Sequence, residues 1–479
     1  MIHFFLEKAD IRKLEFLRYM EKVSSQKELR EVIIKDLSIS KFLLNKVIDE
    51  LNNDFETYHL ENEFKLIPSS AGVKLEKKGN SAASQLELLL VKDSLAFSLI
   101  TEIFFGTFTS INEYSEHHFI SYSSVYNKMS EIKTYLKQFG FTVTKKNELS
   151  GNEKKIRLFF SYLFTKVYNQ NLGIYPKEVE EKSAIFIYQL EKYRQQPLKE
   201  YPKIKLSHYI NVVFLRVSQN NYLKKESLHV ERSFLKENKT AVWLTNTLKE
   251  LGLNVPNDKC ICEIDELFCF LKAKELIEVD NFLNYVINQN FKIYSFNFMN
   301  ATKNRFPDLS KYIDHNMRQI DLIHFNALYF ILPMKQPLRS PDSKSVAYGF
   351  PDYVTFCQSY IKEQKNNQEI WKLNQFFFYK YLLILVNGEL LNSSSNSINL
   401  YVDFSDGQKY TNLILGIIKR FLGFEIIYQE FVNDKTDIIL SDVYFENYNH
   451  IYQVTWETSP DAADWEKFIL ELEKLRKNN

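Results

Sequence analysis

Residues 121–136 combine side chains that could contact the bases and phosphates of DNA. In a helix, hydroxyl, amide and ammonium groups would gather on one side of this stretch, from Tyr122, Ser123, Tyr126, Asn127 and Lys128. The opposite side is apolar at steps of four and three residues, through Val125, Met129, Ile132 and Leu136. Hydroxyl and amide groups can hydrogen-bond base edges, and an ammonium can neutralise a phosphate. The pattern therefore predicts a recognition helix with one buried side.

A recognition helix needs a neighbouring helix and a tight turn to hold it. Ser121 stands where an N-cap belongs, because its hydroxyl can accept from the free amides of the first turn. Residues 111–118 can form the shorter supporting helix, and we expect Phe119 and Ile120 to fill the angle between the two helices. This order predicts a helix-turn-helix.

The stretch after Gly140 changes to a period of two, which is typical of strands. Residues 141–144 alternate, turn residues occupy 147–152, and an extended pattern resumes at 154–157. The segment from Lys128 to Arg157 holds eight Lys or Arg against three Glu, an excess suited to phosphate contacts. We expect a β-hairpin wing that presents Lys145, Lys146, Lys154 and Lys155 to the DNA backbone. The alternative is a small amphipathic helix pair with a solvated basic side.

The same spacing occurs earlier in the chain. Ser40, Leu44, Ile48 and Leu51 repeat the spacing of the N-cap serine and the first three apolar residues of the later stretch. The outward side of this helix would carry Lys41, Phe42, Asn45 and Lys46. An asparagine can hydrogen-bond a base edge and a phenylalanine can meet a thymine methyl group. Asp49 and Glu50 offset the lysines, so this unit should contact DNA more weakly or mainly hold the second unit.

Further elements complete the first unit and open the second. Helices are expected from residue 11 to residue 17 and over 26–33, before the turn and helix at 37–51. Residues 64–78 alternate around a Pro/Ser/Gly turn, which predicts a first wing bearing Lys74, Lys77 and Lys78. A long amphipathic helix is expected over 86–105.

Composition and charge limit the class of protein. The chain has 479 residues, with 45% hydrophobic and 25% charged residues, which predicts a globular protein of three to five domains. Its net charge is +1, so a DNA-binding surface must be local. Lys and Arg exceed Asp and Glu by only 23 to 22 over residues 1–157, which favours dimers that combine weak contacts.

Location and cofactors follow from what the sequence contains. The first ten residues resemble no secretory leader and no apolar run reaches membrane-spanning length, so we expect a cytoplasmic protein without membrane contact. Cys260, Cys262 and Cys269 lack the spacing of zinc sites, and reduced thiols on a packed helix are expected instead of a metal site. Aromatic stripes favour core packing, so no cofactor is expected.

The remaining chain divides into a helical part and a mixed part. Residues 158–392 are helical, with a loop at 333–351, and fit two modules that join near 278–280. Strands are expected at 398–404, 424–431, 437–441 and 450–456, with helices at 410–421 and 462–476. This last block is acidic, with eight Lys or Arg against fourteen Asp or Glu from residue 398, so we expect sensing or dimerisation there.

Taken in order, two helix-turn-helix units, the junction at 151–157, two helical modules and an α/β tail resemble the Mga/AtxA family of transcriptional regulators. The resemblance implies a mainly α multidomain protein with two N-terminal winged helix-turn-helix units, two all-helical PRD-like domains and a C-terminal α/β domain similar to IIB components of the sugar phosphotransferase system. The domains would span 1–80, 81–157, 158–278, 279–392 and 393–479. The implied partners are promoter DNA in double-stranded form, a second copy of the chain in a homodimer or higher oligomer, and HPr or other phosphocarriers.

The resemblance also implies candidate phosphorylation sites. The segment 205–210 looks like the part of a PRD that carries a phosphorylatable histidine, which makes His208 the candidate as a partly exposed imidazole. In the second module His324 is the candidate, and His315 competes with it. A working IIB domain carries a cysteine after its first strand, whereas residues 404–407 have none. Ser405 could accept a phosphoryl group, but nothing nearby is expected to activate it.

The sequence thus favours a dimeric DNA-binding regulator, not an enzyme, modulated by histidine phosphorylation. One alternative is a phosphocarrier or signalling scaffold whose helix-turn-helix units contact only proteins. Another is an RNA-binding antiterminator, but such proteins begin with a short β-rich domain, unlike residues 1–157.

Overall fold

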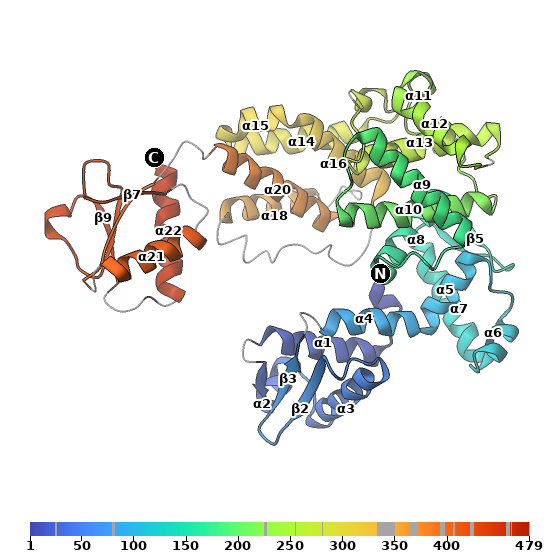
Figure 1. Cartoon of the computed structure of the whole chain (residues 1–479), viewed down its shortest axis with the longest axis horizontal. Helices are drawn as coiled ribbons and strands as arrows, with labels where there is room; N and C mark the ends of the chain where they lie inside the picture. Colours follow the sequence, from blue (N-terminus) through green and yellow to red (C-terminus); the bar gives the residue numbers. More distant parts are fainter. Residues whose placement is uncertain are drawn as a thin grey trace. The chain divides into compact units, whose positions relative to one another are not determined.

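The structure of the chain is a computed structural model. It describes residues 1–23, 26–78, 82–224, 228–253, 255–279, 281–332, 350–364, 372–392, 398–405, 408–421, 426–456, 460 and 462–478. The chain forms two compact units, Met1–Ser295 with Gln319–Leu338, and Phe296–Arg318 with Arg339–Asn479. Both are mainly helical (Figure 1), and the expectation of a mainly α protein is confirmed. Among the described residues, no helix combines the length and apolar character that a membrane crossing requires.

The first unit begins with a three-helix arrangement closed by a small sheet. Its elements are α1 (Lys8–Lys22), β1 (Lys27–Leu29), α2 (Arg30–Asp36), α3 (Lys41–Thr57), β2 (Phe64–Pro68) and β3 (Gly72–Lys77). The sheet has the order β1-β3-β2 with antiparallel pairing. The helix expected over 26–33 is wrong in its first part, because Lys27–Leu29 pairs with Gly72–Lys74 and the helix starts only at Arg30.

The next segment of the chain also has a helix-turn-helix followed by a hairpin. Its elements are α4 (Ala82–Asp93), α5 (Leu95–Phe105), α6 (Ile111–His117), α7 (Tyr122–Lys137), β4 (Phe141–Val143) and β5 (Leu149–Gly151). The single helix expected over 86–105 is broken at Ser94, whose hydroxyl caps α5 by accepting from the amide of Phe97. The hairpin β4–β5 is antiparallel, as expected for a wing, but its second strand ends at Gly151.

Residues 154–157, expected as strand, lie instead in the first turns of α8 (Glu153–Tyr168). The helical part of this unit continues with α9 (Lys177–Arg194), α10 (Glu200–Ser218), α11 (Arg232–Glu237), α12 (Lys239–Glu250), α13 (Asn257–Ala273) and α16 (Met317–Phe330). Helix α10 packs against both α8 and α9 (Figure 1). Phe159, Phe160 and Phe164 of α8 are buried, so the start of this helix is held in a large aromatic core.

The second unit contains a helical group and a small α/β sheet. The helical group comprises α14 (Asn290–Arg305, from Phe296 on), α15 (Ser310–His315), α18 (Pro351–Glu363) and α20 (Asn374–Asn392). Most of the loop expected at 333–351 lies outside the described residues.

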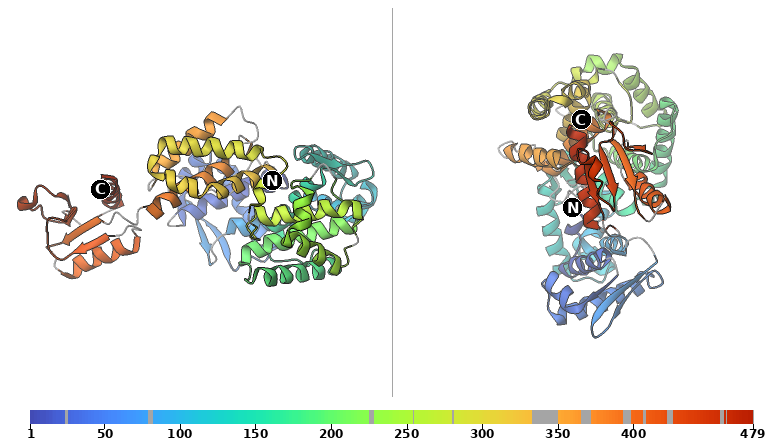
Figure 2. Two further views of the ribbon diagram at one scale, coloured as in Figure 1. Left: turned by 90° about the horizontal axis from the view of Figure 1, so that it is seen from above. Right: turned by 90° about the vertical axis from the view of Figure 1, so that its left-hand side faces the viewer.

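The sheet has the strands β6 (Ile398–Asp403), β7 (Ile426–Gln429), β8 (Ile438–Ser441) and β9 (Tyr452–Thr455). All pairs are parallel, in the order β7-β6-β8-β9. Apolar residues of α21 (Gln408–Phe421) and α22 (Ala462–Asn478) share one core cluster with β6 and β8. Figure 2 shows both helices alongside this sheet. The expected α/β tail is confirmed, although residues 424 and 425 of its second strand lie outside the described part.

Candidate nucleic-acid interface

The pattern of buried and exposed residues that the sequence predicts for 121–136 is confirmed in α7. Its buried residues are Val125, Met129, Ile132 and Leu136, while Tyr122, Ser123, Tyr126 and Asn127 are exposed. Ser121 caps the helix, because its hydroxyl accepts from the amide of Ser124. The rings of Tyr122 and Tyr126 stack with their centroids 6.2 Å apart. Helix α7 therefore presents a polar and aromatic side to its surroundings.

Lys128 is less available than its neighbours on this helix. Its side chain is 19% exposed, and Nζ lies 3.0 Å from Oε1 of Glu7 and 2.9 Å from Oε2 of Glu131. Burial by itself disfavours the charge, but the hydrogen bonds to Glu131 and Glu7 raise the pKa of Lys128. The ammonium is therefore retained but already paired, so a phosphate would have to displace a carboxylate from it.

Phe119 does not fill the angle between α6 and α7, contrary to expectation. Its side chain is 97% exposed, whereas Ile120 packs against the core. The backbone at Phe119 is left-handed, with φ of 55°, which turns its side chain away from the helix pair. Helical periodicity could not reveal this, because the residue belongs to the turn.

The corresponding helix α3 has the same construction. Leu44, Ile48 and Leu51 are buried, and Ser40 caps the helix through the amide of Leu43. On its outward side Lys41, Phe42, Asn45 and Lys46 are all exposed.

The polar groups on α3 are partly engaged within the chain. Oδ1 of Asn45 accepts from Nη1 of Arg30 at 2.6 Å, and Nε of Arg30 donates to the carbonyl of Ser69 at 2.7 Å. Lys46 lies 3.7 Å from Glu50. Arg30 thus ties α3 to the β2–β3 turn, a role that no local sequence pattern indicates.

The two wings differ in how far their lysines are exposed or paired with carboxylates. Lys145 and Lys146 are exposed in the β4–β5 turn, and Nδ2 of Asn147 anchors that turn by donating to the carbonyl of Thr109 at 3.0 Å. In the first wing Lys74 pairs with Glu76 at 2.7 Å and Lys77 lies 4.0 Å from Glu21, while Lys78 is exposed. The second wing is therefore the better phosphate-binding element.

The prediction that Lys154 belongs to the second wing is wrong, because this residue is buried in α8. Its Nζ lies 2.6 Å from Nε2 of His229 and 3.2 Å from Oε2 of Glu266, and 3.8 Å from the ring centroid of Phe330. Lys155 is exposed, but on α8 beside Gly140 and not on the hairpin.

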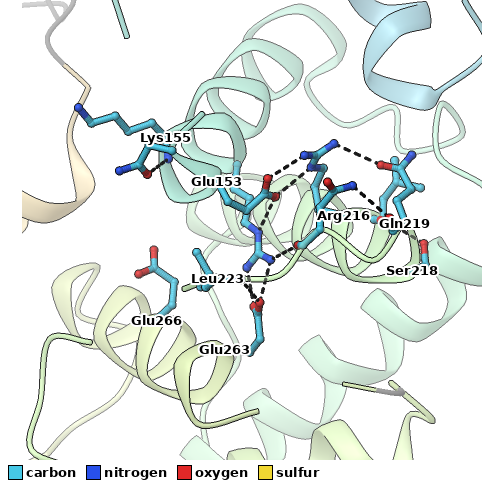
Figure 3. Close-up of polar contacts among 12 residues, drawn as sticks. Glu153, Lys155, Arg216, Ser218, Gln219, Leu223, Glu263 and Glu266 are labelled. Atoms are coloured by element: carbon cyan, nitrogen blue, oxygen red, sulfur yellow. Dashed lines mark hydrogen bonds and ion pairs between the residues drawn. The ribbon is translucent and has the colours of Figure 1, made fainter. Parts of the chain in front are cut away.

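Arg157 is buried as well, and it belongs to an ion-pair network that joins α8, α10 and α13. Figure 3 labels the other charged members of this network, which are Glu153, Arg216 and Glu263. The Arg157 guanidinium contacts both carboxylate oxygens of Glu263 at 2.5 and 3.0 Å, and Arg216 pairs with Glu153 at 2.7 Å. With these groups removed, the segment 128–157 keeps six lysines against two glutamates, so a basic excess remains.

The two candidate histidines, His208 and His324, are fully buried. The prediction that the His208 imidazole is partly exposed is therefore wrong. Nε2 of His208 lies 2.7 Å from the carbonyl of Asn169, and Nδ1 lies 2.9 Å from the hydroxyl of Tyr175. Nδ1 of His324 lies 2.9 Å from the carbonyl of Ile320. Burial lowers the pKa of each imidazole to about 4. Both rings are therefore neutral core groups in this conformation, and neither can meet a phosphoryl donor without local opening.

The cysteines are free, as expected, and Cys260, Cys262 and Cys269 all lie on α13. Ligand atoms of His229, Asp265 and Cys269 lie within 4.8 Å of one another in the described part. Asp265 accepts hydrogen bonds from the amides of His229 and Val230, and the His229 ring faces the Lys154 ammonium. These contacts fit an internal polar network, because Asp265 already accepts from His229 and Val230 and the His229 ring already contacts Lys154.

Ser405 has a partner that the sequence did not predict. Its hydroxyl donates to Asp442, whose Oδ1 also accepts from the Ser405 amide at 2.9 Å. These hydrogen bonds lower the pKa of Asp442. Residues 406 and 407 of this loop lie outside the described residues.

Comparison with known proteins connects this geometry with a family. Residues 79–164 match the Mga helix-turn-helix domain, a range that contains α4 to α7 and the β4–β5 hairpin. The chain is 27% identical over 222 residues to the capsule synthesis positive regulator AcpB of Bacillus anthracis, covering 44% of this chain and 42% of AcpB. It is 24% identical over 221 residues to the capsule synthesis positive regulator AcpA of the same organism, covering 46% and 44%. The chain thus spans less than half of the length of these relatives. Residues 79–164 are therefore similar to the Mga helix-turn-helix domain, within a chain that resembles two positive regulators of capsule synthesis over less than half of its length.

Proposed function

We propose that this protein is a cytoplasmic, DNA-binding transcription regulator whose main duplex contact is the outward side of α7 with the β4–β5 turn. The observation that carries the proposal is that α7 has one buried apolar side and one exposed polar side. Its apolar stripe is fully used in packing, while Tyr122, Tyr126 and Asn127 remain exposed beside a basic wing. The names of the two relatives, both positive regulators of capsule synthesis, support the same function.

The finer organisation is part of the proposal. Residues 1–80 and 81–157 would be winged helix-turn-helix units, followed by PRD-like modules over 158–278 and 279–392 and a IIB-like domain over 393–479. The chain would act as a homodimer or higher oligomer, because the paired or shielded lysines of α3 and α7 give each copy only weak contacts. Two weak half-site contacts on one duplex multiply into useful affinity.

Replacing Lys145 and Lys146 by alanine together should weaken binding and flatten its salt dependence. Each phosphate contact adds about 0.9 to the slope of log K against log salt, so the double variant should lose about 1.8. Fluorescence anisotropy of the full chain across a salt series, on a duplex selected from a random library, measures this slope.

A matched control is the pair Lys177 and Lys192, which are exposed on α9. Their double replacement by alanine should leave the slope unchanged. Equal slopes for wild type and the Lys145→Ala/Lys146→Ala variant would remove the wing from the interface. Asn127→Ala tests α7 itself, and we expect it to narrow the affinity ratio between the selected and a scrambled duplex.

Replacing Glu7 by glutamine should strengthen DNA binding. Glu7 is the partner of Lys128 on another element, and its loss would leave the ammonium with Glu131 alone. Because the pair is half-exposed, we expect a gain of only about two- to five-fold, in line with ~0.5–1 kcal/mol for such pairs. The same anisotropy assay at low salt checks this, with Glu61→Gln as the exposed control. A loss of affinity would show that the Glu7–Lys128 pair supports the interface.

We also propose a regulatory input through phosphorylation of His208 by HPr or another phosphocarrier. Since both ring nitrogens are engaged with Asn169 and Tyr175, the modification requires α10 to separate locally from its neighbours. The added charge of about −1.5 to −2 would then keep the module open. Incubation with phosphoenolpyruvate, enzyme I and HPr, followed by peptide mass mapping, tests the proposal, and the absence of label on His208 would refute it.

A further inference from the structure

Phe119 is the most exposed large apolar side chain in the described part of the chain. It lies in the turn between α6 and α7, two residues before the N-cap Ser121, where these helices pack side by side (Figure 1). A single exposed phenylalanine would need no explanation if the turn required it or if the ring packed locally. The ring does not pack locally, because it is 97% exposed. The turn does not require a phenylalanine either, because the equivalent turn before α3 is made without one.

In that equivalent turn the residue that corresponds to Phe119 is Ser38, at the same distance before the N-cap Ser40 of α3. Both residues are left-handed, with φ of 52° for Ser38 and 55° for Phe119. The following amides close the same turn, since Ile39 donates to the carbonyl of Ile34 at 3.1 Å and Ile120 to that of Ser115 at 3.0 Å. Serine therefore suffices to make this turn. A bulky residue is rare in the left-handed region, so phenylalanine makes the backbone less favourable and gives nothing in packing.

The surroundings of Phe119 indicate what the ring contacts. It precedes the first turn of α7, which carries the exposed Tyr122 and Ser123. The segment that follows keeps six lysines against two glutamates once its buried pairs are set aside, so the surface suits a polyanion. In the major groove, the apolar group that a phenylalanine can recognise is the C5-methyl group of thymine.

We propose that Phe119 is a specificity-determining residue that packs its ring against a thymine methyl group at the edge of the α7 footprint. This inference rests on the proposed function and deepens it, since it names the base and the chemical group that are recognised. The first unit, with Ser38 in the same position, lacks this contact.

The experiment uses the full chain and a duplex that it selects from a random library. Each thymine is replaced in turn by deoxyuridine, which lacks only the C5-methyl group. We expect one or two positions at which wild type loses about four-fold in affinity, the effect of burying one methyl group. The variant Phe119→Ser should bind the unmodified duplex more weakly and show no further loss at one of those positions. Its melting temperature should not fall, because serine holds the same turn at position 38.

A matched control is Phe42→Ser, which removes the exposed ring on α3. It should leave the thymine position assigned to Phe119 sensitive to deoxyuridine. If Phe119→Ser keeps every deoxyuridine penalty of wild type while still binding the duplex, the inference is overturned and the proposed function stands. A change in the sedimentation mass of Phe119→Ser with unaltered duplex binding would also overturn it, in favour of a protein contact. If wild type enriches no duplex from the library, the proposed function itself fails.

Discussion

Arg157→Ala should lower the free energy of unfolding of the first unit by about 3–5 kcal/mol, because it leaves Glu263 buried without its counter-charge. Arg157 is 1% exposed, and its guanidinium contacts both Glu263 oxygens, Glu153 and the carbonyl of Asn221. Burial alone disfavours the guanidinium charge, but the Glu263 and Glu153 carboxylates more than compensate and raise the pKa of Arg157. The guanidinium therefore keeps its charge, and removing it leaves the buried Glu263 carboxylate without its counter-charge.

Thermal and urea unfolding of the full chain, followed by circular dichroism, measure this effect. The matched control is Lys182→Ala, which breaks an exposed pair with Glu178 on α9 and should cost less than about 1 kcal/mol. The double variant Arg157→Met/Glu263→Leu should recover most of the lost stability, since it removes both buried charges. Equal unfolding midpoints for Arg157→Ala and Lys182→Ala would contradict the network in Figure 3.

This network also shows where sequence reasoning reached its limit. Residues 154–157 have the basic and alternating character of a wing strand, and only their partners reveal a buried junction. Glu263 is 106 residues away from Arg157, and His229 is 75 residues away from Lys154. Local pattern contains no information on such pairs. A lysine or arginine is buried only when distant residues supply its counter-charge.

Features determined by short-range spacing were predictable. The N-cap serines and the apolar stripes of α3 and α7 follow from residues within one or two helical turns, and the structure confirms both. The break at Ser94 was missed, because the apolar pattern continues across it without Gly or Pro. The exposure of Phe119 is not predictable for a related reason. Apolar character by itself predicts burial, whereas the backbone φ at that turn decides the direction of the side chain.

The burial of His208 and His324 is also not predictable from the local sequence. A histidine on an amphipathic helix is compatible with either side, and α10 is buried around much of its circumference. The environment of His208 is set by Tyr175 and Asn169, on segments that periodicity within α10 cannot place. The consequence of this burial is the second large effect that we expect.

Acidification from pH 6.5 to pH 4.5 should destabilise the first unit by about 2–3 kcal/mol for each of His208 and His324. Burial lowers the pKa of both imidazoles from an ordinary value near 6.5 to about 4. Between these values the unfolded chain binds a proton that the folded chain does not. The stability from the neutral rings is therefore complete above pH 6.5, is lost as the pH falls, and stops changing below about pH 4.

Urea unfolding of the full chain at several pH values, compared with His208→Gln, tests this sign and size. Glutamine is neutral at every pH in this range and its amide can still donate to the Asn169 carbonyl, so the variant should lose one histidine's share of the pH dependence. His324→Gln should remove a similar share. The two effects should add, because the His208 ring contacts Asn169 and Tyr175 whereas the His324 ring contacts Ile320 and Ser295. A pH dependence that is identical in wild type and both variants would mean that the imidazoles titrate freely, and hence that α10 and α16 open readily. The same opening is what phosphorylation of His208 would require, so the acid measurement gives a lower limit for the free energy of local opening that a phosphocarrier has to overcome.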